Sequence, residues 1–341
     1  MIGSITVTNV NQALAEALHW LDAVGVEEET RNGPVLACPT PVITTYAQPQ
    51  QRVLFSPLRN ANPFFHLMEA LWMLAGRDDL KFPLYFNSHF ADFSDDGETL
   101  WGAYGYRWRH RFGYDQLKVI AEELQRNPQS RRCVLSMWDG TYSYEMDSDL
   151  QKAAAGGRDV PCNTHAYFDC RDGRLNLTVC NRSNDAIWGA YGANAVHFSV
   201  LLEYMAKWIG VPMGVYNQFT NNLHMYTNIY PRNMLRRMAA DARDHDYYGM
   251  TGSPVHYPLI STDIETWDSD LRQFFADPAI TSFGDPFFRE VAVPMRRAWH
   301  ERKAKQGTGL DFAQQIKASD WRIACVSWIN AKETKVRAIA K

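Results

Sequence analysis

The stretch "THAYFDCRDGRLNLTVCNRS", residues 164–183, has the clearest structural pattern in the chain. Apolar and polar residues alternate over two runs, which is typical of strands with one buried face. Arg171, Asp172 and Gly173 separate the runs, and Asp and Gly readily adopt the positive φ angles of hairpin turns. The sequence therefore predicts an antiparallel hairpin that forms part of a central sheet.

Segments with helical spacing of apolar residues lie on both sides of this hairpin. Residues 10–24, 62–76 and 114–128 are predicted helices, and the second has an Asn-Pro start and a Gly end. The longest such segment, residues 194–210, carries its large apolar residues on one face. It is predicted to be a central helix buried on that side.

The remaining segments complete the predicted sheet. Residues 27–46 are rich in turn formers, residues 130–139 have an apolar centre typical of a strand, and residues 211–226 are predicted as one returning strand. The sequence predicts a single α+β domain over residues 1–341, with a central mixed sheet covered by helices. A mostly helical C-terminal extension is expected from about residue 231.

The composition limits the classes of partner. The 341 residues are 46% hydrophobic and 21% charged, and the net charge of −3 provides no basic surface for duplex nucleic acid. No apolar run is long enough to span a membrane, and the N-terminus lacks the layout of a signal peptide, so a cytoplasmic protein is expected. The six cysteines contain no C-x-x-C pair, which favours reduced thiols over a zinc site or disulfides.

Cys162 follows a proline in "DVPCN", residues 159–163. The proline restricts the backbone, and Arg182 at the end of the hairpin would supply the positive field that makes a thiol a nucleophile. The alternative is an unreactive buried thiol, which is a common state of free cysteine. The residues by themselves leave both interpretations open.

Three arginines and a serine form a candidate phosphate clamp. Arg131 and Arg132 are adjacent, and Arg182 and Ser183 follow the hairpin. Guanidinium groups match phosphate oxygens with paired hydrogen bonds. Adjacent arginines on a strand usually point to opposite faces, so simple surface charges are the alternative.

Three further polar residues lie in apolar surroundings. Glu69 is on the apolar side of the predicted helix at 62–76, which suits a proton-transfer role, and pairing with a core arginine is the alternative. His224 and Tyr226 alternate along a predicted strand and share one face, as a sugar-binding pair requires. Ordinary packing is the alternative for these two residues.

Four ordered motifs resemble the thymidylate synthase family, which includes the pyrimidine nucleotide hydroxymethylases of phages. They are "SRR" at 130–132, "PCN" at 161–163, "NRSND" at 181–185 and "LHMY" at 223–226. The resemblance covers about residues 10–230. It implies the thymidylate synthase fold, in which two subunits form a homodimer through their sheets and share active sites.

The resemblance also implies roles for the nucleotide-binding residues. Arg131 and Arg132 would reach the phosphate from the partner subunit, and Arg182, Ser183 and Arg31 would complete the phosphate site. His224 and Tyr226 are similar to the pair that binds the 3′-hydroxyl of the sugar.

The chemistry that the resemblance implies is carried by Cys162. It would add to C6 of a pyrimidine, so that C5 attacks the one-carbon unit of 5,10-methylenetetrahydrofolate. Glu69 would organise proton transfers, and Tyr104 is similar to the tyrosine of the family's Tyr-Gly motif. Asn163 stands where the family has histidine and alters the polar surroundings of the pyrimidine.

The expected folate site combines four residues. Asp185 is similar to the residue that holds the pterin ring, Gly189 belongs to the adjoining loop, and Phe90 and Phe93 stand where the family has paired tryptophans. The family's C-terminal tail is not recognisable at residues 335–341. Reduced shielding by phenylalanine favours attack of water on the transferred carbon, which gives a hydroxymethyl group.

The expected activity is therefore 5-hydroxymethylation of a pyrimidine deoxynucleotide. The amide of Asn194 can donate and accept, which complements uracil, but an extra residue in "WGAYGAN" leaves dCMP open beside dUMP. Thymidylate synthase activity is the alternative enzyme. A family member without turnover that binds nucleotide or RNA is the alternative of another class.

Overall fold

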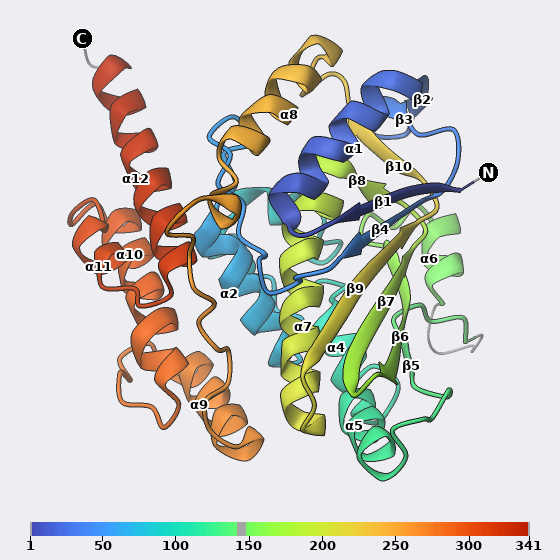
Figure 1. Ribbon diagram of the computed structural model, residues 1–341, viewed down its shortest axis with the longest axis vertical. Helices are drawn as coiled ribbons and strands as arrows, with labels where there is room; N and C mark the ends of the chain where they lie inside the picture. Colours follow the sequence, from blue (N-terminus) through green and yellow to red (C-terminus); the bar gives the residue numbers. More distant parts are fainter. Residues whose placement is uncertain (1, 142–147, 340–341) are drawn as a thin grey trace.

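The computed structural model describes residues 2–141 and 148–339, with side chains described up to Thr334 in the last helix. The tail at 335–341, where the resemblance fails, therefore lies outside the described side chains. The chain forms two sheets covered by helices (Figure 1), which confirms the predicted α+β class.

The larger sheet is mixed and has six strands. The predicted hairpin lies within it, and Arg171 faces Arg174 across a turn in which Asp172 and Gly173 have φ angles of 51° and 69°. Both angles are positive, as two-residue hairpin turns require. In spatial order the strands are β1 (Gly3–Val7), β4 (Val42–Tyr46), β9 (Met213–Thr220), β7 (Arg174–Asn181), β6 (Asn163–Arg171) and β5 (Val134–Ser136).

A second sheet corrects two sequence predictions. Residues 27–46 are not mainly turns, because only two short connections, at residues 31–32 and 38–41, separate three strands. Residues 211–226 form two strands, which separate at Asn221 and join different sheets. The second sheet has the order β2 (Val26–Thr30), β3 (Gly33–Ala37), β10 (Leu223–Tyr226) and β8 (Asn184–Asp185).

The central helix α7 (Asn194–Ile209) packs on β7 and β9, and α2 (Pro63–Leu74) packs on α7. The predicted apolar face of α7 is buried, and the burial extends beyond that face. Every residue from Asn194 to Ala206 is buried, because the sheet covers one side and α2 and α5 cover others. The other helices of this part are α1 (Val10–Val24), α3 (Lys81–Phe86), α4 (Tyr104–Arg109), α5 (Gln116–Arg126) and α6 (Asp149–Ala154).

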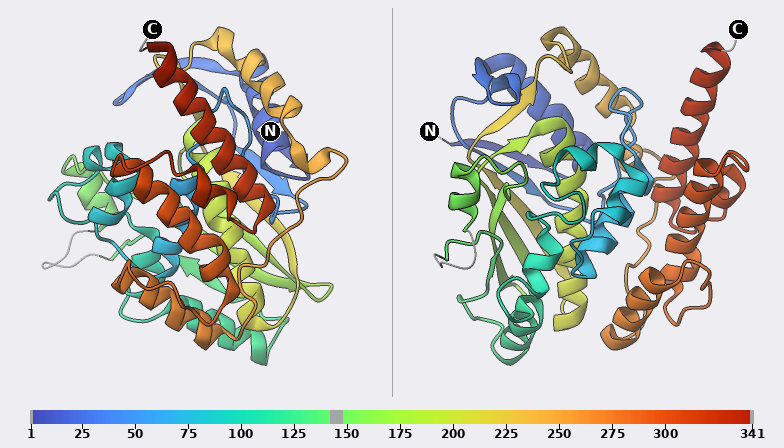
Figure 2. Two further views of the ribbon diagram at one scale, coloured as in Figure 1. Left: turned by 90° about the vertical axis from the view of Figure 1, so that its left-hand side faces the viewer. Right: turned by 180° about the vertical axis from the view of Figure 1, so that it is seen from behind.

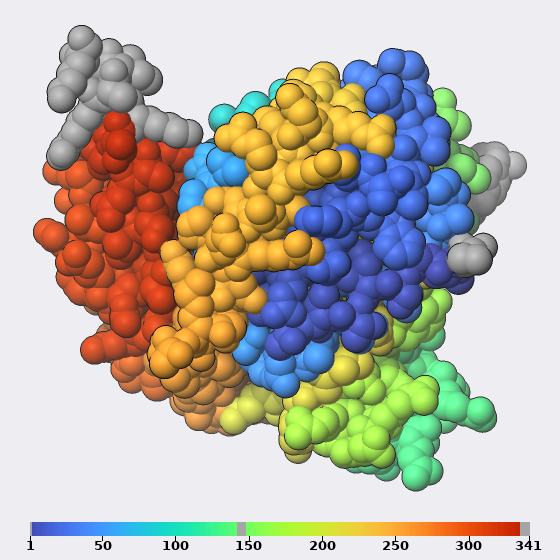
Figure 3. Space-filling view, turned by 45° about the horizontal axis from the view of Figure 1, so that its top comes forward, coloured from blue at the N-terminus to red at the C-terminus, as the bar shows by residue number. Residues whose placement is uncertain are grey.

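The C-terminal helices form an outer layer on α2 (Figure 2, right). They are α9 (Ile264–Ala276), α10 (Val293–Lys303), α11 (Leu310–Gln314) and α12 (Ser319–Ile339). In contrast, α8 (Leu235–Asp244) lies along α1, and Figure 3 shows this gold segment between α1 and the outer layer. The division of the chain at about residue 231 stays a prediction. Among the described helices, none is long and apolar enough to cross a membrane.

Candidate active site

The ends of the hairpin bring Cys162 and Arg182 together. Cys162 precedes β6 and Arg182 follows β7, and the backbone N–H of Arg182 donates to the carbonyl of Cys162 at 2.9 Å. The Arg182 side chain donates to the carbonyls of Pro161 and Val160 at 2.8 and 2.9 Å. Its Nη2 then lies 3.7 Å from the Cys162 sulfur. The structure thus places the cation that the sequence suggested beside the thiol.

Two opposing effects act on this thiol. Burial raises the pKa of Cys162, the Arg182 guanidinium lowers it, and the Asp159 carboxyl raises it further. The net direction is upward, so the thiol is protonated at neutral pH in the nucleotide-free chain. A nucleophile at this position therefore requires removal of its proton when the substrate binds.

Tyr104 holds the backbone at Cys162. Its hydroxyl oxygen accepts hydrogen bonds from the backbone N–H groups of Cys162 and Asn163 at 3.0 and 3.1 Å. Burial raises the pKa of Tyr104, so its hydroxyl stays neutral. Asp159 also accepts a hydrogen bond from the backbone N–H of Gly102 at 2.8 Å. This bond is a second link between the segment before Tyr104 and the segment before Cys162.

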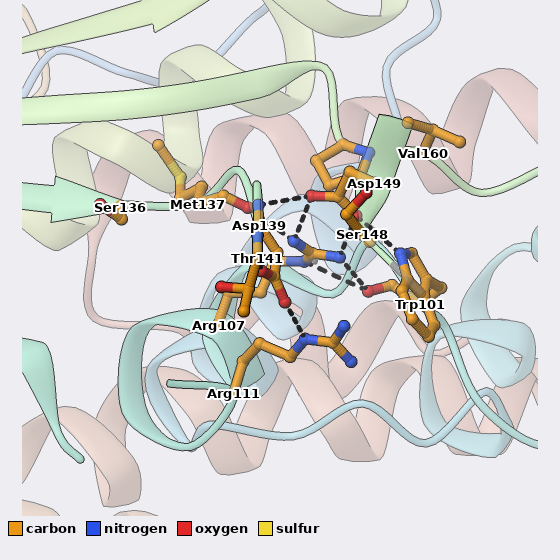
Figure 4. Close-up of polar contacts among 12 residues, drawn as sticks. Trp101, Arg107, Arg111, Ser136, Met137, Asp139, Thr141, Ser148, Asp149 and Val160 are labelled. Carbon is orange, nitrogen blue, oxygen red and sulfur yellow. Dashed lines mark hydrogen bonds and ion pairs between the residues drawn. The ribbon is translucent and has the colours of Figure 1, made fainter. Parts of the chain in front are cut away.

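A buried ion pair anchors the segment that carries Tyr104 (Figure 4). Arg107 and Asp149 are both fully buried, and they share two hydrogen bonds of 2.7 and 2.8 Å. Asp149 also accepts from the Trp101 indole and from the backbone N–H of Asp139, each at 2.7 Å. Arg107 donates to the carbonyl of Met137. The start of α6 is thus tied to α4 and to the segment after β5.

An open pocket of 250 Å³ collects four of the predicted nucleotide-binding residues. Arg31 comes from the turn between β2 and β3, Ser183 from the segment after β7, and His224 and Tyr226 from β10. The rings of His224 and Tyr226 are 5.4 Å apart, which confirms that they share one face. The complete lining is Thr30, Arg31, Asn32, Ser183, Asn222, His224 and Tyr226.

The sequence analysis missed Asn222 in this pocket. Its side-chain oxygen lies 2.8 Å from Nδ1 of His224 and so orients the imidazole ring. Its position gave a sequence signal for this role, because Asn222 lies two residues before His224, directly ahead of a strand. Without the pairing of the strands, however, its side chain was indistinguishable from an ordinary turn residue.

Arg131 and Arg132 do not line this pocket. They lie before β5 rather than on a strand, because regular pairing begins only at Val134. Both side chains are exposed, and Arg132 Nη2 lies 3.2 Å from the Glu123 carboxylate. Within one chain, the structure therefore does not bring these arginines to the other candidate site residues.

Four buried asparagines lie between the candidate nucleophile, Cys162, and α7. Asn194 donates to Asn184 at 3.2 Å, and Asn184 donates to Asn181 at 3.3 Å. Asn181 lies directly opposite Asn163 in the hairpin, so their side chains occupy neighbouring positions on one face. Asn163 is 1% exposed, and neither atom of its amide has a hydrogen-bond partner among the described residues.

Gly189 has a structural reason to be glycine. A Cβ atom at this position would lie 2.2 Å from the side-chain oxygen of Asn184. The close approach lets Asn184 reach Asn194, so Gly189 supports the predicted base-binding residue. Sequence analysis missed both Asn181 and Asn184, whose importance depends on hydrogen bonds between separate segments.

Glu69 contacts a histidine rather than an arginine. The other eleven residues of α2 are buried, and only the Glu69 side chain of this helix is partly accessible to solvent. Its Oε2 lies 3.0 Å from Nε2 of His197 on α7, although the angle does not allow a hydrogen bond. Sequence analysis missed His197, which lies one helical turn after Asn194 on the same face.

Asp185, which is predicted to bind folate, lies beside an exposed tryptophan. Asp185 caps the irregular helix at Ala186–Ala193 by accepting from the backbone N–H groups of Ile187 and Trp188 at 2.9 and 2.5 Å. Burial raises the pKa of Asp185. The Trp188 ring, which sequence analysis missed, is 42% exposed beside it.

The two predicted phenylalanines lie beside α2. Phe90 packs against Phe65 with ring centroids 5.3 Å apart, and Phe65 lies one turn before Glu69. Phe93 is 50% exposed and contacts Phe90. Phe90 therefore lies within one helical turn of the predicted proton-transfer residue.

Comparison with known proteins identifies the family. A family model described as thymidylate synthase matches residues 56–244, which is more than half of the chain. The deoxyuridylate hydroxymethyltransferase of Pseudomonas phage M6 is 45% identical over 98% of this chain and 95% of its own length. The chain therefore belongs to the thymidylate synthase family.

Two further relatives are a hydroxymethyltransferase and a thymidylate synthase. The deoxyuridylate hydroxymethyltransferase of Bacillus phage SP01 is 34% identical over 75% of this chain and 66% of its own length. A thymidylate synthase of Symbiobacterium thermophilum is 32% identical over 51% of this chain and 64% of its own length.

Proposed function

We propose that this enzyme transfers a one-carbon unit to C5 of dUMP and releases 5-hydroxymethyl-dUMP. The observation that carries the proposal is the contact between Cys162 and Arg182, whose chain neighbour Ser183 lines a pocket with a histidine and a tyrosine. Relatives that are named deoxyuridylate hydroxymethyltransferases support dUMP as the substrate. A covalent thioether at C6 would make C5 nucleophilic.

The nucleotide would be held at three points. Arg31, Arg182 and Ser183 would bind the phosphate, and His224 and Tyr226 would bind the sugar hydroxyl. The amide of Asn194 would pair with the base. Its donation to Asn184 orients that amide and leaves its oxygen as an acceptor for N3–H of uracil.

5,10-Methylenetetrahydrofolate would supply the one-carbon unit. The residues present fit a pterin, because a half-buried carboxylate acceptor on Asp185 lies beside the exposed flat ring of Trp188. A carboxylate accepts from the amino edge of such a ring, and an indole offers a stacking surface. Gly189, Phe90 and Phe93 would complete this part of the site.

Product analysis tests the proposal. The protein is incubated with 5,10-methylenetetrahydrofolate and either dUMP or dCMP, and the nucleotides are analysed by mass spectrometry. We expect a hydroxymethyl increment on dUMP, with tetrahydrofolate as the second product. An increment on dCMP instead would assign the other base.

Two other outcomes would contradict the proposed reaction. A methyl increment with dihydrofolate would mean thymidylate synthase activity, because the folate then supplies a hydride. Nucleotide binding without any product would indicate a member of the family that has lost turnover.

We further propose that the enzyme is a homodimer formed through the larger sheet. Alternate residues of its strands are buried on the helical side, while the other face is partly or fully accessible. Val134 and Tyr167 are 41% and 45% exposed and face each other on that side. Their row continues across the sheet through Thr178, Asn217, Thr45 and Thr6.

Subunit complementation tests whether Arg131 and Arg132 serve the partner's site. We expect the double variant Arg131→Ala, Arg132→Ala and the single variant Cys162→Ala each to be inactive alone. After unfolding and refolding as an equal mixture, heterodimers contain one intact site, so about a quarter of wild-type activity should return. Activity that stays absent while mixed dimers form would show that both arginines act within their own subunit.

The reaction would take place in the cytoplasm, and in the host cytoplasm if a phage encodes the chain. The six cysteines are free thiols, which is compatible with a reducing compartment. The phage origin of the two deoxyuridylate hydroxymethyltransferases supports the second part of this proposal.

A further inference from the structure

Two buried polar atoms without a hydrogen bond to any described residue meet between α2 and α7. Among the described residues, the buried polar atoms without a hydrogen bond include Oε2 of Glu69, Nε2 of His197 and both amide atoms of Asn163. His197 is 5% exposed and Asn163 is 1% exposed. Buried polar atoms are normally hydrogen-bonded to protein or water, so this concentration points to a bound molecule.

A series of neighbouring residues leads from the pair toward Cys162. His197 lies one turn after Asn194 on α7, and Asn194 donates to Asn184. Asn184 donates to Asn181, whose strand partner is Asn163. Asn163 directly follows Cys162, so α7 and the hairpin link Glu69 and His197 to the candidate nucleophile.

Glu69 and His197 together can bind a water molecule and accept a proton from it. Oε2 of Glu69 and Nε2 of His197 are 3.0 Å apart but are not aligned for a direct hydrogen bond. Each atom can therefore bind the same water molecule, with the carboxylate accepting its proton. A carboxylate in this position is a general base, and the imidazole orients the water.

We propose that Glu69 and His197 together bind and activate the water that attacks the methylene carbon of the covalent nucleotide. The inference rests on the proposed function. The water oxygen bonds to the methylene carbon, its proton passes to Glu69, and the methylene π electrons move into the ring. Release of the C6–S bond then returns an electron pair to Cys162 and restores the C5–C6 double bond.

The proposal predicts how the intermediate divides between two nucleophiles. 2-Mercaptoethanol is added to the complete reaction, and mass spectrometry measures the ratio of thioether nucleotide to hydroxymethyl nucleotide. A thiolate already carries its charge and needs no base, whereas water does. We expect His197→Asn and His197→Gln to raise this ratio about 100-fold, the lower end of the range of general base catalysis. Intact-protein mass spectrometry should also show more covalent nucleotide on Cys162.

The chain offers a matched control in a second histidine–glutamate pair. His256 Nε2 lies 2.9 Å from Glu203, which follows His197 on α7, and His256 shares a small cavity with Trp321 of α12. His256→Asn should leave the product ratio unchanged. The ratio compares two products of one intermediate, so a smaller folded fraction does not alter it.

The outcomes separate this inference from the function on which it rests. A wild-type ratio in both His197 variants, or an equal change in the His256 variant, would overturn the role of His197. A wild-type enzyme that forms neither the hydroxymethyl nucleotide nor the thioether would instead overturn the proposed function.

Discussion

Replacing Cys162 by alanine is expected to lower kcat by at least about 10⁴-fold, the scale on which enzymes lose turnover without their nucleophile. The affinity for dUMP should stay within a few-fold, because the sulfur is not among the atoms proposed to hold the phosphate, sugar or base. Turnover by single-turnover kinetics and dUMP affinity by calorimetry check the two parts separately. Intact-protein mass spectrometry should show no covalent nucleotide.

Cys170→Ala provides the control for this prediction. Cys170 is on β6, the same strand that Cys162 precedes, and burial also raises the pKa of its thiol. It lies at the other end of the strand, opposite Leu175, and has no contact with Arg182. Its replacement should leave kcat nearly unchanged. Persistent turnover in Cys162→Ala would exclude covalent catalysis by this residue.

The second large effect is expected on stability. Asp149→Asn should lower the free energy of unfolding by about 3–5 kcal/mol, because it leaves the charge of Arg107 buried without its counterion. Both side chains are fully buried, and Asp149 accepts four hydrogen bonds in the network of Figure 4. Urea unfolding followed by circular dichroism measures the loss.

An exposed ion pair supplies the comparison. His89 Nδ1 lies 3.5 Å from Asp92, and their side chains are 82% and 75% exposed. Asp92→Asn should leave the free energy of unfolding almost unchanged, since water screens such pairs. An equally small loss in Asp149→Asn would show that the buried network is not needed for stability.

Local patterns carried much of the fold prediction. The hairpin followed from alternation and from an Asp-Gly turn, and the helix at α2 followed from its Asn-Pro start and helical spacing. These features depend on neighbouring residues, so a sequence displays them directly. The second sheet was missed because Asn32 and Gly33 drew attention to turns, whereas the flanking residues pair with a strand nearly two hundred positions away.

The candidate site was predictable to a similar extent. Short motifs located Cys162, Arg182 and Ser183, and the strand pattern placed His224 beside Tyr226. The roles of these residues in catalysis and binding stay predictions, as does the contribution of the partner subunit. The His197 contact with Glu69 had no local signal, because it depends on the packing of α2 against α7.

The sequence alone thus determined the hairpin, the main helices and the position of the candidate nucleophile, since spacing and turn chemistry act over a few residues. Only the tertiary structure decided which distant side chains meet. It brought the turn before β3, the segment after β7 and β10 to one pocket, and it placed His197 against Glu69. Such contacts are set by strand pairing and helix packing between segments that are far apart in the chain.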